Sequence, residues 1–372
     1  MKKLVEFYKS IIESNLKGSL AIFVITIIAS LVVYIPFRNN PDIIHKYWDG
    51  PNYMFIAKTM YNIPKTHPLS PYRLENYYFS SHLPLFPIVI RAINFFGFNY
   101  LIAMSLAILL CSGFASVAVF LYFKETGYVK YPFWSALLLI FFPIRMLLYR
   151  SIGATEPLFI GLIALSFLAY TKEKYVWAFT LAALASITRI FGILLLTSYF
   201  ITIIHERKFK LLKLLPIIPF MLLLTFIYYH FIYGDFFAYF RYNGAVMSSF
   251  PINIFRIYVG AKDAHSSEYY FVLYAINILG IAQLWRKKET FYFSAMYFIA
   301  MLFVVHLDLS RYMLPLAPFA LAIGFDNLLS KRSAAIVLTL IPLIYFYTWG
   351  FIPTNVILDW VWNDLLKFLF KT

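Results

Sequence analysis

Charged residues and cysteines are scarce in this sequence. Asp, Glu, Lys and Arg make up only 13% of the 372 residues, and hydrophobic residues make up 62%. Soluble domains carry about 25% charged residues. A chain this apolar cannot cover its surface with polar groups in water, so an ordinary soluble protein is excluded and a bilayer is favoured. The single cysteine, Cys111, lies inside an apolar run, which excludes an internal disulfide and a cysteine metal cluster.

The motifs of nucleotide chemistry are also missing. There is no P-loop, no glycine-rich dinucleotide loop, no H-E-x-x-H and no serine-elbow motif. The first long polar loop has no Asp-x-Asp pair, and Asp308-Leu309-Ser310 has that spacing with only one acid. ATP-driven transport and nucleotide-sugar chemistry are therefore disfavoured. We expect no cofactor, while a need for a divalent metal ion stays open.

Basic residues, by contrast, are in excess, with a net charge of +15. They are scattered singly and in pairs between apolar runs, so the expected partners are anionic lipid headgroups and not nucleic acid. Aromatic residues reach 21%, with 40 Phe and 30 Tyr, which is typical of a protein with many rings at the membrane interface.

Apolar runs recur along the chain and predict about eleven membrane crossings. The first follows Lys2, Lys3, Lys9 and Lys17 without a small-residue cleavage site, which predicts an uncleaved span with a cytoplasmic N-terminus. Segment 83–97 is apolar but short, with Pro84, Pro87 and Arg91 inside it. It is re-entrant, interfacial or the first half of a kinked span, and we count it as non-crossing to set the topology. The predicted spans are 18–36, 98–123, 131–148, 153–171, 175–188, 190–204, 212–233, 269–285, 290–306, 312–330 and 333–352.

Compact basic clusters set the expected orientation by the positive-inside rule. With 83–97 non-crossing, they all fall on the side of the N-terminus: Lys124/Lys130, Lys172/Lys174, Arg207/Lys208/Lys210/Lys213, Arg286/Lys287/Lys288 and Lys331/Arg332. Two long loops, 37–82 and 234–268, then lie outside, and the first carries interfacial helices. Segment 355–370 is expected to be an amphipathic surface helix, with Asp359, Asn363, Lys367 and Lys371 opposite Trp360, Leu366 and Phe370. We therefore predict an all-α polytopic membrane protein with a single domain over 1–372.

Most polar residues near the membrane collect on the outer side of this topology. Ionisable groups beside hydrocarbon are costly and usually face a cavity, so their convergence predicts one pocket on that face. The residues are Trp48, Asp49, Arg145, Arg150, Glu156, Arg189, Asp235, Arg241, Asp308 and Arg311.

Asp49 is the candidate general base. It precedes Tyr53, Ile56, Ala57, Met60 and Tyr61, whose spacing predicts a short interfacial helix. A carboxylate beside a Trp and close to lipid is expected to have a raised pKa and to accept a proton. The alternative is that Asp49 only caps the helix.

Arg189 and Arg311, if they converge, match the oxygens of a lipid phosphate in a bidentate fork. Each alone is more simply a snorkelling side chain. Glu156 is either a pocket acid or a first-turn residue favoured by the helix dipole. His82 is either a phosphate or sugar ligand or a structural histidine.

Five blocks of the sequence together resemble the PIG-V family, the GPI mannosyltransferase 2-like proteins of the GT-C fold. They are Trp48-Asp49 with Tyr53 and Ile56-Ala57; His82 with Pro84-Leu85-Phe86-Pro87; Phe142-Pro143 leading to Thr155-Glu156; Ala185-Ser186-x-Thr188-Arg189-x-x-Gly192; and Arg311-Tyr312 with Pro315-Leu316 and Pro318.

This resemblance implies a GT-C-like bundle and an inverting transferase. It would use a polyprenyl-phosphate sugar, typically dolichyl-phosphate mannose, with a lipid-linked or glycan hydroxyl as acceptor. It places the catalytic acid at Asp49 and pocket residues at His82, Glu156, Arg189 and Arg311. We add Trp48, Tyr53, Arg145 and Tyr312 to the expected pocket, and assign Arg189, Arg311 and His82 to the donor phosphate. The shorter chain, rich in Lys, Tyr, Phe and Ile, favours a prokaryotic relative.

The expected location is the plasma membrane with an extracytoplasmic site, or the ER membrane with a lumenal site for a eukaryotic source. The alternative function is a lipid-linked-sugar flippase or transporter, which would show repeated halves and broken helices at the midplane. A non-catalytic membrane scaffold is a third class and would need no cluster of acid and arginines on one side.

Overall fold

The computed structural model describes residues 12–72, 75–243, 246–260, 264–327 and 331–371. In these residues the chain is all-α apart from two isolated β-bridges, as predicted. The α-helices are α2 (Asn15–Tyr34), α3 (Ile43–Lys46), α4 (Asp49–Thr59), α5 (Leu85–Phe95), α6 (Tyr100–Thr126), α7 (Pro132–Phe141), α8 (Arg145–Ser151), α9 (Glu156–Thr171), α10 (Tyr175–Ser186), α11 (Leu194–His205), α12 (Ile217–Tyr233), α13 (Ala238–Asn243), α14 (Asn253–Gly260), α15 (Ala264–Ala282), α16 (Lys288–Leu302), α17 (Leu309–Tyr312), α18 (Lys331–Leu338), α19 (Ile341–Phe351) and α20 (Asp359–Phe370).

Short 3-10 segments continue or join these helices. They are η1 (Ile35–Phe37), η2 (Ser70–Tyr72), η3 (Asn76–Ser81), η4 (Ile190–Ile193), η5 (Phe209–Leu214), η7 (Leu314–Leu316) and η9 (Ile352–Asn355), and η8 (Ala317–Ile323) is π-helical.

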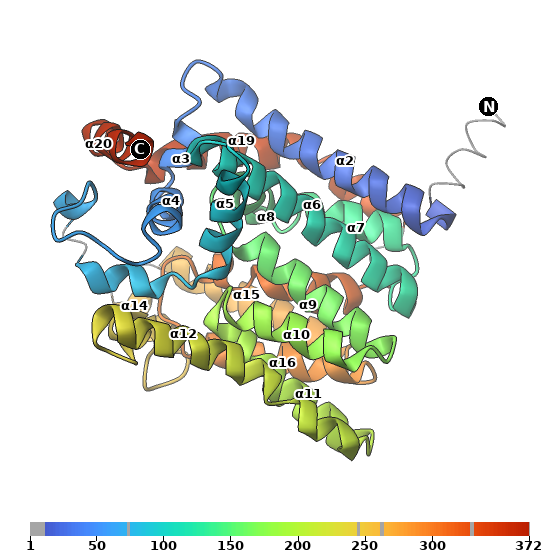
Figure 1. Ribbon diagram of the computed structural model, residues 1–372. Coiled ribbons are helices and arrows are strands. Elements are labelled where there is room, and N and C mark those ends of the chain that lie inside the picture. Colours follow the sequence, from blue (N-terminus) through green and yellow to red (C-terminus); the bar gives the residue numbers. More distant parts are fainter. Residues whose placement is uncertain (1–11, 73–74, 244–245, 261–263, 328–330, 372) are drawn as a thin grey trace.

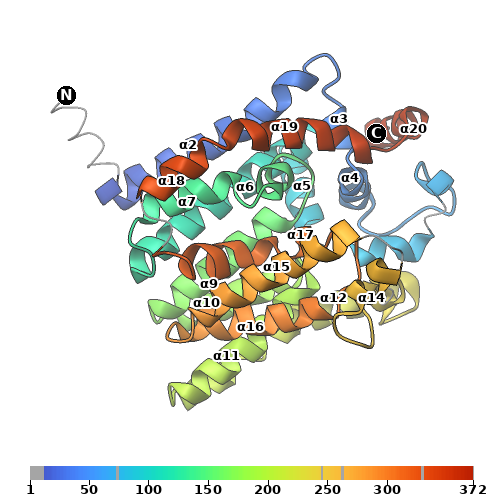
Figure 2. The ribbon, with the colours of Figure 1, turned by 180° about the vertical axis from the view of Figure 1, so that it is seen from behind.

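The long helices lie side by side in one bundle, with α6 packed against α2, α7 and α9 (Figure 1). Small residues allow this close approach, as is usual between membrane helices. A Cβ atom on Gly113 of α6 would lie 2.3 Å from the Phe23 ring of α2, and one on Gly161 of α9 would lie 2.5 Å from the Phe114 ring. Seen from behind, α18 and α19 run beside α2 (Figure 2).

The chain is an integral membrane protein. Among the described residues, three helical segments are long and apolar enough to cross a bilayer: Asn15–Phe37, Tyr100–Thr126 and Phe209–Tyr233. Each of the eleven predicted spans contains helix, but most of these helices are shorter, so the number eleven stays a prediction. The span predicted at 131–148 consists of two helices, α7 and α8, which meet at an angle of 77° around a break that contains Pro143. A proline cannot continue the hydrogen bonding of the preceding turn.

Segment 83–97 forms α5, whose 11 residues span only about 16 Å at about 1.5 Å per residue. This is about half the thickness of the hydrocarbon core. The helix is therefore too short to cross the bilayer alone, which is consistent with a re-entrant or interfacial segment or with half of a kinked span.

The basic clusters gather at one end of the bundle, beside the start of α2. Lys124 Nζ contacts the backbone oxygens of Ile12 and Glu13, and Lys172 lies 3.0 Å from Glu125. Lys208 and Lys288 both contact Glu206, and Lys287 contacts the carbonyl of Tyr128. These contacts confirm the predicted same-side placement for these lysines; Lys2, Lys3 and Lys9 lie outside the described residues.

Helices α3, α4, α14 and α20 lie at the opposite end of the bundle (Figure 1). Helix α4 is buried on all sides along most of its length, whereas the sequence predicted a single apolar stripe. Every residue from Gly50 to Ala57 is buried, because α4 is enclosed by α3, α5, α6 and α20. The predicted stripe also ran too far, since the helix ends at Thr59 and Met60 adopts a left-handed conformation.

The C-terminal helix α20 packs on α4, and the side chains that it buries there differ from the apolar face that the sequence predicted to lie on the membrane surface. Val361, Trp362, Leu365 and Leu369 are the buried residues, whereas Trp360 and Phe370 are half exposed. The indole of Trp362 donates a hydrogen bond to Asp42, and Lys58 of α4 donates to the carbonyls at the end of α20. The helix therefore stabilises the end of the bundle that contains α4.

Candidate active site

Asp49 is the first residue of α4, and the backbone around it is tightly held. A Cβ atom at the next residue, Gly50, would lie 2.7 Å from the carbonyl oxygen of His45, so only glycine fits this turn. The amide of Trp48 donates to the carbonyl of Asn355. The carboxylate of Asp49 contacts side chains from other segments, which gives it a tertiary role beyond that of a helix cap.

Glu156 is brought to Asp49 by a second glycine. A Cβ atom on Gly153 would lie 2.8 Å from the Cα atom of Gly50 and 1.9 Å from the methyl group of Met104. Because the two glycine backbones touch, the start of α9 lies directly beside the start of α4. Glu156 is the first residue of α9 and its side chain is fully buried.

Arg189 projects from the turn that joins α10 to η4. This turn is compact, since a Cβ atom on Gly192 would lie 2.5 Å from the backbone of Ala185 and Ser186. Arg189 Nη1 lies 2.6 Å from Glu156 Oε1 and 3.1 Å from Thr155 Oγ1. The guanidinium is 11% exposed, which shows that it is packed in the protein instead of snorkelling to the interface.

Arg311, on the short helix α17, joins the two acids. Its Nη2 atom lies 2.6 Å from Asp49 Oδ2, and its Nε atom lies 2.5 Å from Glu156 Oε1. The face of its guanidinium lies 4.5 Å from the centre of the Tyr149 ring. Four residues from distant parts of the chain thus form one continuous ionic chain in the order Asp49, Arg311, Glu156 and Arg189.

His82 completes the group on the far side of Asp49. Its Nε2 atom lies 3.8 Å from Asp49 Oδ1, and its Nδ1 atom lies 3.0 Å from the hydroxyl of Ser81. The edges or faces of Tyr53 and Tyr78 pack on the imidazole at 5.2 and 5.3 Å. The imidazole is therefore fixed in place with Nε2 directed at the carboxylate.

These side chains border a cavity of about 390 Å³ at this end of the bundle. The cavity contains seven of the nine predicted site residues: Trp48, Asp49, Tyr53, His82, Arg189, Arg311 and Tyr312. Glu156 is not part of the wall and lies buried beneath the two arginines. Arg145 lies behind the wall, where its Nη1 atom is 2.5 Å from Asp308.

Three other polar residues that the sequence grouped with the pocket lie elsewhere. Arg150 is buried inside the bundle and donates to the carbonyl of Ser112 and the hydroxyl of Ser116. Asp235 and Arg241 pair with each other and are not on the cavity wall. Arg150 lies on the short helix α8, inside the bundle, and Asp235 and Arg241 pair with each other within the second long loop.

The structure adds cavity residues that the sequence analysis did not assign to the site. They are Tyr78, Ser81, Leu83, Thr155, Thr188, Ile190, Phe191, Tyr239, Asn243, Val246, His306 and Asn355. The sequence analysis had already placed Asp308 in the predicted pocket. His306, two residues before it at the end of a predicted span, could have been predicted as a pocket residue on the same ground. Asn355 had no such signal, because its position depends on the pairing of Tyr47 with Val356.

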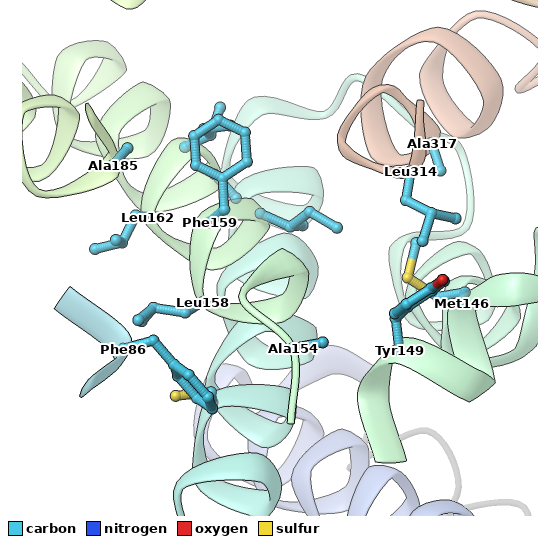
Figure 3. Close-up of a cluster of buried hydrophobic side chains, with 14 of the residues drawn as sticks. Phe86, Met146, Tyr149, Ala154, Leu158, Phe159, Leu162, Ala185, Leu314 and Ala317 are labelled. Carbon is cyan, nitrogen blue, oxygen red and sulfur yellow. The ribbon is translucent and has the colours of Figure 1, made fainter. Parts of the chain in front are cut away.

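A hydrophobic cluster provides a firm base for the pocket elements (Figure 3). Phe86 of α5, Tyr149 of α8 and Leu158 of α9 belong to it, and each is at most 7% exposed. Helix α5 follows His82 in the chain, α8 provides the Tyr149 ring that packs on Arg311, and α9 begins with the buried Glu156. Close packing of this kind allows few alternative positions for the polar groups above it.

The pKa of Asp49 differs from the prediction in direction. Burial favours the neutral acid, as expected, but the positive charge of Arg311 and the nearby His82 outweigh it. Together they hold the pKa of Asp49 below its ordinary value. The expectation of a raised pKa is therefore wrong for the free protein, because the sequence did not reveal how close Arg311 lies.

Within the described residues, no three His, Cys, Asp or Glu side chains are grouped so that they could hold a metal ion. The polar centre consists of two acids and two arginines whose formal charges cancel, with His82 beside them. Arginines arranged around a cavity provide a site for a phosphate group.

An all-α membrane bundle with this arrangement of helices has a GT-C-like fold. A similar solved structure is that of ArnT from Cupriavidus metallidurans bound to undecaprenyl phosphate, with a TM-score of 0.53 and 15% sequence identity. The match covers 86% of this chain and 63% of the ArnT chain, so this chain matches less than two thirds of that protein's length. No family model and no curated protein matches the sequence, and the likeness to the PIG-V family therefore rests on the five blocks alone.

Proposed function

We propose that this protein is a membrane glycosyltransferase that moves a sugar from a polyprenyl-phosphate donor to a hydroxyl group of a lipid-linked or glycan acceptor. The observation that carries this proposal is the placement of Asp49 2.6 Å from Arg311 in one cavity, with Arg189 on the same wall. A GT-C-like fold shared with a protein that binds undecaprenyl phosphate supports it.

The arginines supply the charge that the leaving group needs. Polyprenyl phosphate leaves as a stable anion, so it needs electrostatic stabilisation more than protonation. Arg189 and Arg311 are both held by Glu156 and cannot turn away. Preorganised donors of this kind contribute roughly 3 to 4 kcal/mol each to a transition state in a site that excludes water.

The proposed reaction is a single displacement at the anomeric carbon. The acceptor oxygen forms a bond to that carbon while the bond from the carbon to the phosphate oxygen breaks. The acceptor proton passes to Asp49, and the electron pair of the broken bond stays on the polyprenyl phosphate. Attack from the face opposite the phosphate inverts the configuration of the sugar.

An apolar cavity beside the site fits the first part of the polyprenyl chain. It measures about 330 Å³ and lies between α10 and α12, with Ala183, Leu184 and Phe220 among its walls. Leu184 is five residues before Arg189 in the chain, so the apolar cavity lies along the helix that leads into the turn with Arg189. Phe220 is 54% exposed, which places this cavity at the lipid-facing surface of the bundle.

Mannose is the proposed sugar, because the five sequence blocks resemble a mannosyltransferase family. The proposed acceptor is a membrane-bound or extracytoplasmic glycan or lipid, since the cavity is at the end of the bundle opposite the basic clusters. The two long outer loops of the topology both contribute to it, through Trp48 to Leu83 and through Tyr239 to Val246.

Transfer from a radiolabelled donor tests this proposal. Purified full-length protein is incubated with polyprenyl-phosphate [14C]mannose and native lipid and glycan extracts, and product is separated from donor. We expect label in a lipid or glycan product, no transfer by Asp49→Asn, and normal transfer by Asp364→Asn, which removes an exposed acid of α20. Asp49→Asn that folds normally and keeps near-full activity contradicts the role of Asp49, and movement of intact donor across vesicles without transfer points to a flippase.

A further inference from the structure

The hydrogen-bonding edge of Arg311 is fully used in the free protein. Its Nε atom bonds to Glu156 and its Nη2 atom bonds to Asp49, while Tyr149 covers the face of the guanidinium. Nε and Nη2 form the side-on fork that grips a phosphate or a carboxylate with two parallel bonds. An incoming phosphate can therefore take this fork only when one of the two acids leaves it.

The two acids are not equally free to leave. Glu156 is fully buried, and the same oxygen that accepts from Arg311 also accepts from Arg189. Releasing it from Arg311 would remove one of the two guanidinium groups that balance a fully buried carboxylate, which is unfavourable. Asp49 is 15% exposed and stands on the cavity wall, so its carboxylate is the one that a ligand can replace.

His82 offers an alternative polar partner for the Asp49 carboxylate. His82 Nε2 lies 3.8 Å from the other carboxylate oxygen of Asp49, just beyond hydrogen-bonding distance. A small rotation of the Asp49 side chain away from Arg311 closes this gap. The carboxylate then keeps one polar partner and has one oxygen free toward the cavity.

From these contacts we propose that the donor phosphate replaces Asp49 on Arg311 and that Asp49 becomes available as a base only after this exchange. This inference rests on the function proposed above. It means that one arginine alternates between two anions: it binds the carboxylate in the empty site and the phosphate in the loaded site. The donor must then bind before the acceptor can be activated.

The exchange predicts that removal of the Asp49 charge tightens the binding of a polyprenyl phosphate. The test measures binding of undecaprenyl monophosphate to full-length protein in lipid nanodiscs for the wild type and for Asp49→Asn. We expect roughly tenfold tighter binding by Asp49→Asn, because the lost contact is a charge-assisted hydrogen bond of that order. Asp49→Ser is a second variant with the same expectation, and thermal unfolding checks that each variant is folded.

A matched control separates competition for Arg311 from general repulsion. Asp308 also lines the cavity and carries the same charge, but its partner is Arg145. We expect Asp308→Asn to change affinity by less than about threefold, because the ligand does not compete for Arg145. An equal gain in Asp49→Asn and Asp308→Asn overturns the exchange in favour of simple repulsion.

The remaining outcomes distinguish the inference from the function beneath it. Wild-type binding with unchanged or weaker binding by both Asp49 variants overturns the exchange and leaves a phosphate-binding enzyme in place. No binding by the wild type or any folded variant overturns the proposed function, and the exchange is overturned with it.

Discussion

Gly153 and Gly50 meet backbone to backbone, and a Cβ atom on Gly153 would come within 2.8 Å of the Cα atom of Gly50. This contact sets the distance between Asp49 and Glu156, the first residues of α4 and α9. Asp49 is one residue before Gly50, and Glu156 is three residues after Gly153. The side chains that Arg311 joins are therefore placed by two residues that have no side chain.

The first prediction concerns Gly153→Ala. The added methyl group cannot be accommodated by a side-chain rotation alone, because one of its neighbours is backbone. We expect a loss of about 1 to 3 kcal/mol of stability from overpacking and a fall in transfer of at least tenfold. Thermal unfolding and the radiolabel assay measure these effects. Gly350→Ala is the control, since a Cβ atom there meets nothing within 4 Å; equal effects at both positions would contradict a role for the glycine contact.

A second prediction compares two acids by stability alone. Glu156→Gln removes a fully buried partner of two arginines, and loss of one partner of a buried pair costs about 3 to 5 kcal/mol. Asp364→Asn breaks the pair with Lys367, in which the acid is 52% and the lysine 73% exposed, and exposed pairs contribute less than about 1 kcal/mol. We expect a clear fall in the unfolding temperature for Glu156→Gln only. Similar stabilities of the two variants would show that Glu156 is not held as an ion in the fold.

The third prediction concerns the ring that covers Arg311. Tyr149→Phe keeps the ring, whereas Tyr149→Leu removes it from its position 4.5 Å from the guanidinium. A cation–π contact is worth about 0.5 to 2 kcal/mol, so we expect Tyr149→Leu to lower kcat/KM by about threefold to thirtyfold and Tyr149→Phe to lower it much less. A matching loss in Tyr149→Phe would assign the effect to the hydroxyl group instead of the ring.

The dependence of activity on pH provides the fourth prediction. Burial raises the pKa of Asp49, but Arg311 and His82 bring it below its ordinary value, which is about 4 for Asp. Because the folded value is lowered, ionised Asp49 stabilises the protein above about pH 4 and this stabilisation is lost as the pH falls through the folded value. The acid limb of kcat/KM, which reports the free enzyme, is therefore expected below about pH 4.

The pH dependence of kcat reports the ionisation of groups in the complex with the donor. Once a phosphate takes the place of Asp49 on Arg311, the carboxylate loses its main stabilising charge and its pKa rises. We expect the acid limb of kcat to lie at a higher pH than the acid limb of kcat/KM when both are measured on the full-length protein. The Asp364→Asn variant is the control, and its pH profiles are expected to match those of the wild type. Coincident limbs, or a reversed order, would contradict the release of Asp49 in the loaded site.

Several features of the site were accessible from the sequence. Asp49, Arg189 and Arg311 are charged residues at the ends of apolar runs, and such residues need a cavity. Counting the runs placed them at one end of the bundle, and the structure brings them within one ionic chain. Periodicity was equally informative for helix positions, since each predicted span contains helix.

Other features depend on tertiary contacts that no local pattern carries. The bend of 77° between α7 and α8 turns Arg145 and Arg150 away from the cavity that a straight span would have given them. The buried face of α20 is set by its packing on α4, which the charge pattern alone did not show. The pKa of Asp49 depends on a residue 262 positions later in the chain (311 − 49), so its direction could not be read from Trp48 and the nearby lipid.

The most direct measurement is an experimental structure of the full-length protein in nanodiscs with undecaprenyl monophosphate. We expect the phosphate against Arg189 and Arg311, the first isoprene units toward the apolar cavity between α10 and α12, and the Asp49 carboxylate turned to His82. A phosphate bound away from both arginines, or a bound phosphate with Asp49 still paired to Arg311, would contradict the proposed site and the exchange respectively.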